Sequence, residues 1–276
     1  MQTQKNNLSS LKIIAAVSFV AMVFVNYLAQ MLPLNGMTPG EVSDSLPNLF
    51  APAGLTFSIW GVIYVMLAVF VVFQFGFSKQ TPTSASLDKV RVTFIVNAMA
   101  NIAWIFAWHY RQFELSLALM AVILLTLILI HMSLDKYLLN RIEKIVFRLP
   151  FSLYFGWITV ATVANVTSLL VALGWDGFGL AQEGWAIIIL VVAALIGTAT
   201  MLIKKDIAYG LVFIWAYAGI LIKHNSPAPA GFGGAYPLII WTVIVCLLVY
   251  AAAEIFILLK LLKPRELNPA PETDKT

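Results

Sequence analysis

The sequence predicts an all-α integral membrane protein with about eight transmembrane helices. Hydrophobic residues make up 61% of its 276 residues and charged residues 11%, against about 45–50% and about 25% in soluble domains. The mean hydropathy of +0.90 indicates that the apolar excess extends along the whole chain. A soluble enzyme, a disordered chain and a nucleic-acid-binding protein all fit this composition poorly. The one cysteine, Cys246, excludes internal disulfides and Cys-rich metal sites.

A membrane-spanning helix needs roughly 20 apolar residues to cross the hydrocarbon core. The first apolar segment is long for a signal peptide, and no small-x-small cleavage site follows it, so we expect it to remain in the membrane. The seventh is short and is bounded at both ends by charged residues. The eight predicted helices are 11–32, 54–75, 90–110, 115–134, 149–173, 184–203, 207–222 and 237–262.

The basic residues predict the orientation of these helices. With eight spans, alternate connections lie on alternate sides of the membrane. All of the 17 Lys and Arg residues except Arg111 and Lys223 then fall on the side that carries both chain termini. Because basic residues are retained in the cytoplasm, we expect a multi-pass protein of a cell (inner) membrane with both termini cytoplasmic. Residues 265–276 form a polar cytoplasmic tail in this interpretation.

Two of the predicted helices carry polar and aromatic side chains on one face. At about 100° per residue, Asn97, Asn101, Trp104 and Trp108 fall within an arc of about 60°. In the fifth helix, an arc of about 80° holds a similar set: Tyr154, Trp157, Ala161, Asn165 and Ser168.

The second helix places Phe57, Trp60 and Tyr64 on one side. At about 1.5 Å per residue, Trp60, Tyr64 and Asn101 lie roughly 9–15 Å from the outer ends of their helices. Trp104 and Asn165 fall at a similar depth, and Asn26 of the first helix lies at a comparable level. Polar side chains are costly in hydrocarbon unless they are paired, so this shared depth favours a pocket that opens towards the outer leaflet.

A simpler interpretation stays open for the same residues. Tryptophans near helix ends, such as Trp108, anchor proteins at membrane interfaces. Deeper tryptophans also serve helix packing, and the asparagines can act as interhelical hydrogen-bonding groups worth only about 0.6 kcal/mol each.

Known catalytic motifs are missing from the sequence. It has no phosphate-binding Walker loop, no Gly-x-Ser-x-Gly elbow, no His-Glu-x-x-His and no Asp-rich cluster. We therefore expect no enzyme activity, no catalytic residue and no metal site.

Three stretches, in order, resemble the tryptophan-rich sensory protein family, also called the translocator protein or TspO/MBR family. Residues 50–64, Phe-Ala-Pro-Ala-Gly-Leu-Thr-Phe-Ser-Ile-Trp-Gly-Val-Ile-Tyr, resemble its Pro-Pro-x-Trp-x-Phe-x-x-Val-Trp-x-x-Leu-Tyr element. Residues 101–104, Asn-Ile-Ala-Trp, resemble its Leu-Asn-x-x-Trp element. Pro150-Phe151, Trp157 and the run from Ala161 to Asn165 resemble its Pro-Tyr-x-x-Trp-x-x-Phe-Ala-Thr-x-Leu-Asn element.

The sequence also departs from the family pattern. Leu55 occupies the place of the first family tryptophan, the proline pair is reduced to Pro52 with Ala53, and the match needs a one-residue gap before Trp60. The resemblance covers about residues 11–175 and implies a large, divergent member. We therefore expect a TspO-like five-helix bundle at 1–175, three additional transmembrane helices at 176–264 and the tail at 265–276.

The resemblance implies a bundle that binds apolar ring compounds, which in this family are porphyrins, including haem and its precursors, and sterols. When the family's pocket positions are transferred to the matching positions of this sequence, the resemblance implies a pocket at Trp60, Tyr64, Asn101, Trp104, Trp157, Ala161 and Asn165. Asn97 and Trp108, which share the face of the third helix, complete the predicted ligand-binding set. We expect the protein to bind such a molecule as a sensor or carrier.

Two further functions stay open: a secondary transporter or permease for a small solute, in which the last three helices form a gate, and a regulatory membrane subunit. A tetrapyrrole is the one cofactor-like ligand that we expect. The expected partners are membrane lipid and a hydrophobic small molecule, with no nucleic acid, and a homodimer is left open.

Overall fold

The computed structural model describes residues 2–32, 34–46, 48–76 and 84–262. Within these ranges the chain is helical and has no strand, and eight helices are long and apolar enough to cross a membrane. The prediction of an all-α, eight-helix membrane protein is confirmed. The predicted tail at 265–276 lies wholly outside the described residues.

Most ends of the long helices lie within three residues of the predicted positions. The largest differences are at the starts of three helices: α1 begins at Gln2 instead of 11, α4 at Ser84 instead of 90, and α3 at Ile59 instead of 54. Before the fifth span, a short helix, α6 (Arg141–Glu143), and a π-helical turn, η3 (Lys144–Arg148), precede α7. The eight long helices are α1 (Gln2–Met31), α3 (Ile59–Gly76), α4 (Ser84–His109), α5 (Phe113–Leu134), α7 (Leu149–Ala172), α8 (Gln182–Lys204), α9 (Ile207–Asn225) and α10 (Pro237–Leu262).

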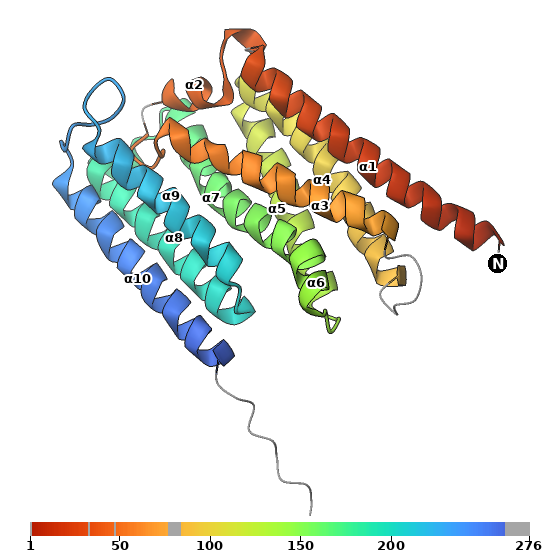
Figure 1. The fold of residues 1–276 in the computed structure, drawn as a ribbon. Coiled ribbons are helices and arrows are strands. Elements are labelled where there is room, and N and C mark those ends of the chain that lie inside the picture. The colour runs from red at the N-terminus through yellow and green to blue at the C-terminus, as the bar shows by residue number, and fades with distance from the viewer. Residues whose placement is uncertain (1, 33, 47, 77–83, 263–276) are drawn as a thin grey trace, which may run out of the picture.

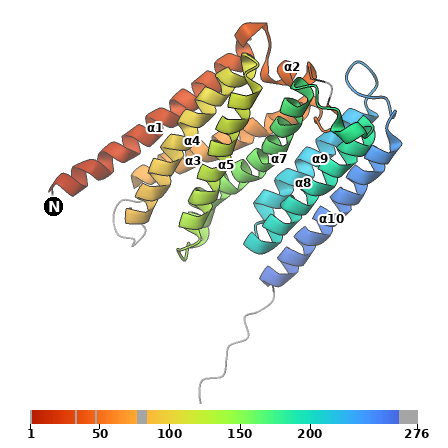
Figure 2. The ribbon, with the colours of Figure 1, turned by 180° about the vertical axis from the view of Figure 1, so that it is seen from behind.

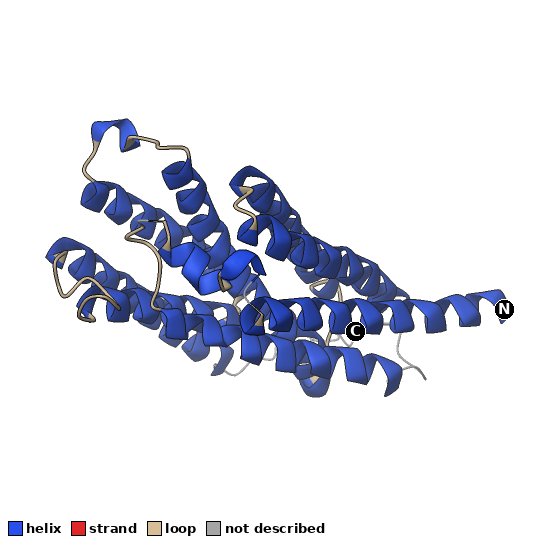
Figure 3. Ribbon diagram, turned by 90° about the horizontal axis from the view of Figure 1, so that it is seen from above, coloured by secondary structure: helices blue, strands red, loops and turns tan. Residues whose placement is uncertain are grey.

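Five of these helices lie together beside the last three (Figures 1 and 2), and their contacts follow a closed order that we call the ring. In the order of the ring, α1 packs against α3, α3 against α7, α7 against α5, α5 against α4, and α4 against α1. The last three helices form a second group, in which α10 packs against α8 and α9, and α9 packs against α7 of the ring. Viewed from above, the helices run alongside one another at moderate inclinations (Figure 3).

A close approach of α7 and α9 joins the two groups. A Cβ atom on Gly156 of α7 would lie 2.9 Å from both the carbonyl oxygen of Tyr209 and the Cβ of Val212 on α9. Small residues at helix contacts let backbones approach in this way, which is the usual route to tight packing in membranes. One hydrophobic core, which includes Phe151, Trp157, Val212 and Tyr250, therefore extends through both groups. The proposed boundary at residue 175 stays a prediction.

The outward faces of the helices are apolar. Val17, Val65, Leu195 and Leu248 are each 62–65% exposed. Exposed apolar surface on this scale marks a membrane contact. The sequence pattern and the packing thus agree that these faces meet lipid.

The segment between α1 and α3 covers one end of the bundle, the end opposite to the start of α1 and the end of α10 (Figure 1). We call this the distal end, and we call residues 34–58, apart from 47, the cover segment. It contains the turns η1 (Leu34–Gly36) and η2 (Gly54–Ser58) and the short helix α2 (Pro39–Asp44).

Helix α2 begins at a capping box. The backbone N–H of Glu41 donates to the Thr38 hydroxyl, and the backbone N–H of Thr38 donates to the Glu41 carboxylate at 2.7 Å. These hydrogen bonds from Thr38 lower the pKa of Glu41 below its ordinary value. Reciprocal bonds of this kind fix the start of a helix.

Hydrogen bonds fasten the cover segment to both groups of helices. Towards the ring, the Trp108 indole N–H donates to the carbonyl of Pro39 at 3.1 Å, and the Asn48 amide donates to the Thr167 hydroxyl at 2.7 Å. Towards α9, the indole N–H of Trp215 donates to the carbonyl of Thr56 at 2.9 Å. The cover segment is therefore the second structural link between the ring and the last three helices.

Further contacts with α9 involve charged and buried groups. Lys223 forms an ion pair of 2.9 Å with Asp44, and a ring nitrogen of the buried His224 lies 2.9 Å from the carbonyl of Leu49. His224 is fully buried although it lies beyond the predicted end of the seventh span. Helix α9 therefore continues past the predicted end at residue 222 and ends at Asn225.

An ion-pair network ties the helices together at the end of the bundle where α1 begins and α10 ends, which we call the terminal end. Asp135, just after α5, accepts hydrogen bonds from Arg148 at 2.6 Å and from Lys204 at 2.8 Å. Asp206, which caps α9, accepts a hydrogen bond from Ser152 of α7 at 2.5 Å. The network therefore connects α5, α7, α8 and α9.

Candidate functional site

An aromatic layer crosses the interior of the five-helix ring. The rings of Trp60 and Tyr64 on α3 are stacked, with centroids 5.4 Å apart. Trp60 also meets Tyr154 and Trp157 of α7 in edge-to-face contacts with centroid distances of 5.7 and 6.3 Å. Such geometries are the favoured ones for aromatic pairs. Three of the predicted residues, Trp60, Tyr64 and Trp157, are thus brought together.

Two asparagines bind this layer to the other side of the ring. Asn26 of α1 donates its amide to the side-chain oxygen of Asn101 on α4 at 2.8 Å, and Asn101 donates to the hydroxyl of Tyr154 on α7 at 3.0 Å. Asn101 and Tyr154 are fully buried. The predicted convergence of amide and aromatic side chains from separate helices is therefore present for Asn101.

A second aromatic group lies nearer the distal end. Trp104 and Trp108 on α4 are stacked, with centroids 5.7 Å apart and planes within 17°. Trp108 also contacts Phe113 edge-to-face at 5.5 Å. Val42 of α2 packs against these rings and is fully buried. The cover segment therefore fills the space beside the second aromatic group.

Two hydrogen-bond donors in these groups have no partner in the described part of the chain. The hydroxyl of Tyr64 and the indole N–H of Trp104 are buried, and no described residue hydrogen-bonds to either. Buried polar groups are nearly always paired, and an unpaired one costs about 1–3 kcal/mol. These two donors are therefore available to a bound molecule.

The remaining predicted residues point to neighbouring helices. Asn97 donates to the hydroxyl of Thr126 at 2.8 Å and to the carbonyl of Ile123, both on α5. Asn165 donates to the hydroxyl of Ser116 on α5 at 3.0 Å. Ala161 is half-buried on the face of α7 that packs against the hydrophobic core. The assignment of all nine residues to a ligand site stays a prediction.

Four residues that contact the aromatic groups lay outside the predicted set: Asn26, Val42, Phe113 and Tyr154. Asn26 and Tyr154 had a signal in the sequence, because one matches the depth of the set and the other shares its helix face. Val42 had none: its place under the cover segment follows from the tertiary fold alone.

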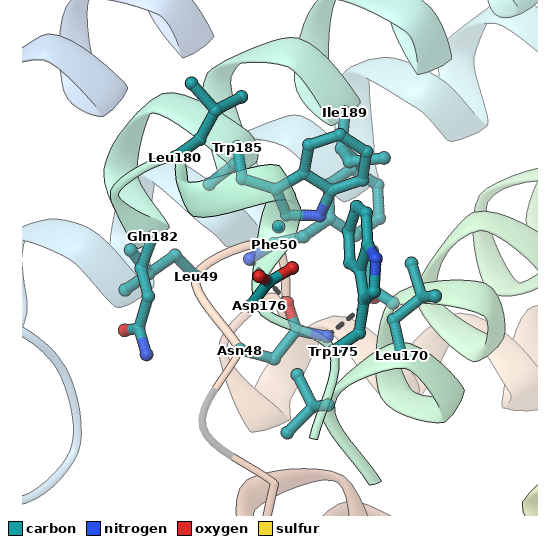
Figure 4. A pocket seen from close by; sticks show the side chains of 14 residues that line it. Asn48, Leu49, Phe50, Leu170, Trp175, Asp176, Leu180, Gln182, Trp185 and Ile189 are labelled. Carbon is teal, nitrogen blue, oxygen red and sulfur yellow. Dashed lines mark hydrogen bonds between the residues drawn. The ribbon is translucent and has the colours of Figure 1, made fainter. Parts of the chain in front are cut away.

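Two cavities lie elsewhere in the described structure, and none of the nine predicted residues lines either. A cavity of about 210 Å³ lies at the distal end, between the end of α7, the start of α8 and the cover segment (Figure 4). A cleft of about 580 Å³ lies at the terminal end beside the ion pairs of Arg148 and Lys204. Among the described residues, no group of three or more His, Cys, Asp or Glu side chains is placed to hold a metal ion.

The family comparison covers both groups of helices. A family model described as TSPO-like protein matches residues 12–256. The chain belongs to this TSPO-like family. The match to the TSPO-like model includes α8, α9 and most of α10, so it extends beyond the segment of about residues 11–175 that carries the sequence resemblance. No curated protein and no solved structure matches the chain.

Proposed function

We propose that this TSPO-like protein binds a hydrophobic ring compound, porphyrin-like or sterol-like, in the distal half of the five-helix ring. It acts as a sensor or carrier in a cell (inner) membrane, with both termini in the cytoplasm and no catalysis of its own. The ligand lies between the aromatic layer of Trp60, Tyr64 and Trp157 and the stacked pair of Trp104 and Trp108. Flat aromatic faces on two sides suit a flat, apolar molecule.

The observation that carries this proposal is the pair of unpaired donors, the Tyr64 hydroxyl and the Trp104 indole N–H. A porphyrin offers carboxylate acceptors at its edge, and a sterol offers a hydroxyl oxygen. Either acceptor removes the cost of about 1–3 kcal/mol that an unpaired buried donor carries. Asn101 is already paired on both sides, so it positions Tyr154 and leaves ligand contact to the other groups.

Entry requires the cover segment to move. Val42 is fully buried against Trp108 and Phe113, and α2 is only six residues long. One hydrogen bond that links α2 to the ring runs from the indole N–H of Trp108 to the carbonyl of Pro39. Displacement of α2 exposes the second aromatic group to a molecule arriving from the distal end.

The test is a titration of purified protein with protoporphyrin IX, and separately with a sterol, followed by quenching of tryptophan fluorescence. Tyr64→Phe removes one hydroxyl and keeps the ring, and Trp104→Phe removes one indole N–H. Each change should weaken binding roughly five- to tenfold, in line with the loss of one buried hydrogen bond of about 1–1.5 kcal/mol.

The matched control is Trp241→Phe, because Trp241 on α10 is 65% exposed and lies on an outward face. It should reduce the starting fluorescence and leave the affinity unchanged. Equal affinity in the wild type and in the Tyr64→Phe/Trp104→Phe double variant would contradict the proposed site.

A second candidate function, a secondary transporter, is favoured by Glu254 on α10. Both carboxyl oxygens of Glu254 are buried without a partner among the described residues, and its side chain packs over Gly210 of α9. An acidic group inside a membrane bundle is costly and is typical of proton pathways. Proteoliposomes under a pH gradient should then show solute flux that Glu254→Gln abolishes, whereas a passive binding protein shows none.

A further inference from the structure

The distal cavity has a lining different from that of the ring interior. It lies between the end of α7, the loop that contains η4 (Gly177–Gly179), the first turn of α8 and residues 48–50 of the cover segment. Leu170 of α7 and Ile189 of α8 line its apolar side. Its polar and aromatic side is formed by Trp175, Asp176 and Trp185 (Figure 4).

The two tryptophans form a right-angled corner. The ring centroids of Trp175 and Trp185 are 4.5 Å apart and their planes meet at 75°. Phe178 packs edge-to-face against Trp175 at 5.1 Å on the loop itself. Figure 4 shows the two indoles bordering the same space. Because the face of an indole carries partial negative charge, this corner attracts a cation.

A fixed carboxylate adds a full negative charge to the corner. One oxygen of Asp176 accepts the backbone N–H of Phe178 at 3.0 Å, which holds the carboxylate in place. In Figure 4 the carboxylate of Asp176 lies beside both indoles and close to Asn48. Among the described residues, no Lys or Arg forms an ion pair with Asp176 or lines the cavity.

The other polar side chain beside the carboxylate is already satisfied. Asn48 donates its amide to Thr167 and accepts the backbone N–H of Phe50 at 2.9 Å. It therefore offers little to an anion or to a neutral hydrogen-bonding ligand. The lining as a whole combines two indole rings, one carboxylate, the neutral polar side chains of Asn48, Thr167 and Gln182, and apolar side chains, and it contains no basic side chain.

We propose that this cavity binds the head group of an organic cation that carries N-methyl groups. A methylated ammonium has few or no N–H donors, so π-faces and a carboxylate recognise it better than hydrogen-bond acceptors do. The volume of about 210 Å³ suits a head group and is below the size of a typical drug-like site. The head group comes either from a free small cation or from a membrane lipid, because the cavity lies at the distal ends of two candidate membrane spans, α7 and α8.

Binding is tested by isothermal titration calorimetry of the full-length protein in a maltoside detergent, which has no choline head group. Choline chloride is the probe, and 3,3-dimethylbutanol, which has the same shape without the charge, is its matched control. We expect choline to bind and the neutral alcohol to bind at least roughly fivefold more weakly. Absence of choline binding, or equal binding of the alcohol, overturns the proposal.

Two variants locate the site. Asp176→Asn removes the charge, and Trp185→Leu removes one wall of the corner. Trp185→Leu should weaken choline binding roughly five- to thirtyfold, the range of a partly desolvated cation–π contact. Asp176→Asn should weaken it roughly two- to fivefold, because Asp176 is exposed and solvent screens its charge. Trp241→Leu on α10 and Tyr64→Phe in the ring should leave it unchanged. The melting temperature of each variant is compared with that of the wild type to detect any loss of folding. Trp185→Phe keeps an aromatic face at this position, so it should retain most of the wild-type affinity for choline even if Trp185→Leu destabilises the fold. Unchanged affinity in Asp176→Asn and Trp185→Leu overturns the assignment.

The source of the cation is distinguished in nanodiscs. Choline binding that is lost in phosphatidylcholine nanodiscs and kept in phosphatidylglycerol nanodiscs identifies a lipid head group. Binding that is equal in both identifies a free cation. Either result supports the cavity as a methylated-ammonium site, and neither depends on whether the ring binds a porphyrin or a sterol.

Discussion

Asn101 on α4 donates its amide to the hydroxyl of Tyr154 on α7 at 3.0 Å, and both side chains are fully buried. Because α4 and α7 are not neighbours in the order of the ring, this bond spans the ring interior. Asn26 of α1 extends the chain of hydrogen bonds to a third helix. The bond therefore fixes the ring at the level of the aromatic layer, beneath the proposed ligand.

A double-mutant cycle should measure the coupling between these residues. Tyr154→Phe and Asn101→Ala each remove one partner, and the double variant removes both. Since hydrogen bonds between membrane helices are worth about 0.6 kcal/mol on average, we expect a coupling free energy of about that size. Unfolding of the protein in mixed micelles measures it. A coupling of zero would show that the two groups do not stabilise the ring together.

The contact between α7 and α9 gives a second prediction. A methyl group on Gly156 would press against the carbonyl oxygen of Tyr209 and the side chain of Val212. Gly156→Ala should therefore lower the free energy of unfolding by about 1–3 kcal/mol, the usual cost of overpacking. Gly61→Ala on α3 is the control, because nothing lies within 4 Å of its added methyl group.

Gly61→Ala should have the opposite sign, with a gain of up to about 1 kcal/mol from higher helix propensity. Equal effects of the two substitutions would mean that α7 and α9 do not approach as closely as described. The two variants thus separate the packing effect from the general effect of removing a helical glycine.

Much of the architecture follows from the sequence because hydrocarbon imposes strict rules. A spanning segment must satisfy its backbone groups internally, so long apolar runs are helices and their ends coincide with charged or turn-forming residues. The last span, Pro237–Leu262, has the predicted bounds. The shared depth of Trp60 and Asn101 was also predictable, since helical rise alone fixes it.

The neighbours of each polar face were not predictable in the same way. Helical periodicity placed Asn97 and Asn101 on one face, yet Asn97 bonds to Thr126 of α5 whereas Asn101 bonds to Tyr154 of α7. Which helix lies opposite a face depends on the order of helices in the ring. Val42 likewise reached the core because the cover segment folds back over the bundle, and no local pattern encodes that.

The ion pairs of Asp135 give a pH prediction. Partial burial raises the pKa of Asp135, but the hydrogen bonds and charges of Lys204 and Arg148 outweigh it and hold that pKa below its ordinary value of 3.8. A carboxyl group with a lowered pKa stabilises the folded state above its ordinary pKa. This stabilisation is lost as the pH falls through the lowered value.

Asp135→Asn should therefore lower the melting temperature at pH 7, and the difference from the wild type should shrink as the pH falls below about 4. Thermal unfolding between pH 3 and pH 7 checks this. Glu114→Gln at the start of α5 is the control, because Glu114 is exposed and forms no ion pair among the described residues. A difference for Asp135→Asn that stays constant over the whole pH range would contradict the assignment.

The orientation of the bundle gives the last prediction. With eight spans, all Lys and Arg residues except Arg111 and Lys223 fall on the side of the chain termini, and we therefore predict that the terminal end faces the cytoplasm. The single native cysteine, Cys246, is buried, so introduced cysteines can be labelled selectively. Leu138, between α5 and α6, is fully exposed at the terminal end, and Ala230 is exposed in the distal loop after α9.

A membrane-impermeant maleimide should label Ala230→Cys in intact cells and Leu138→Cys only after the cells are permeabilised. The unsubstituted protein should give no label in either condition, because Cys246 is shielded by the helices around it. Labelling of Leu138→Cys from outside would invert the bundle. The cover segment would then face the cytoplasm, and both the proposed ring ligand and the proposed organic cation would have to arrive from within the cell.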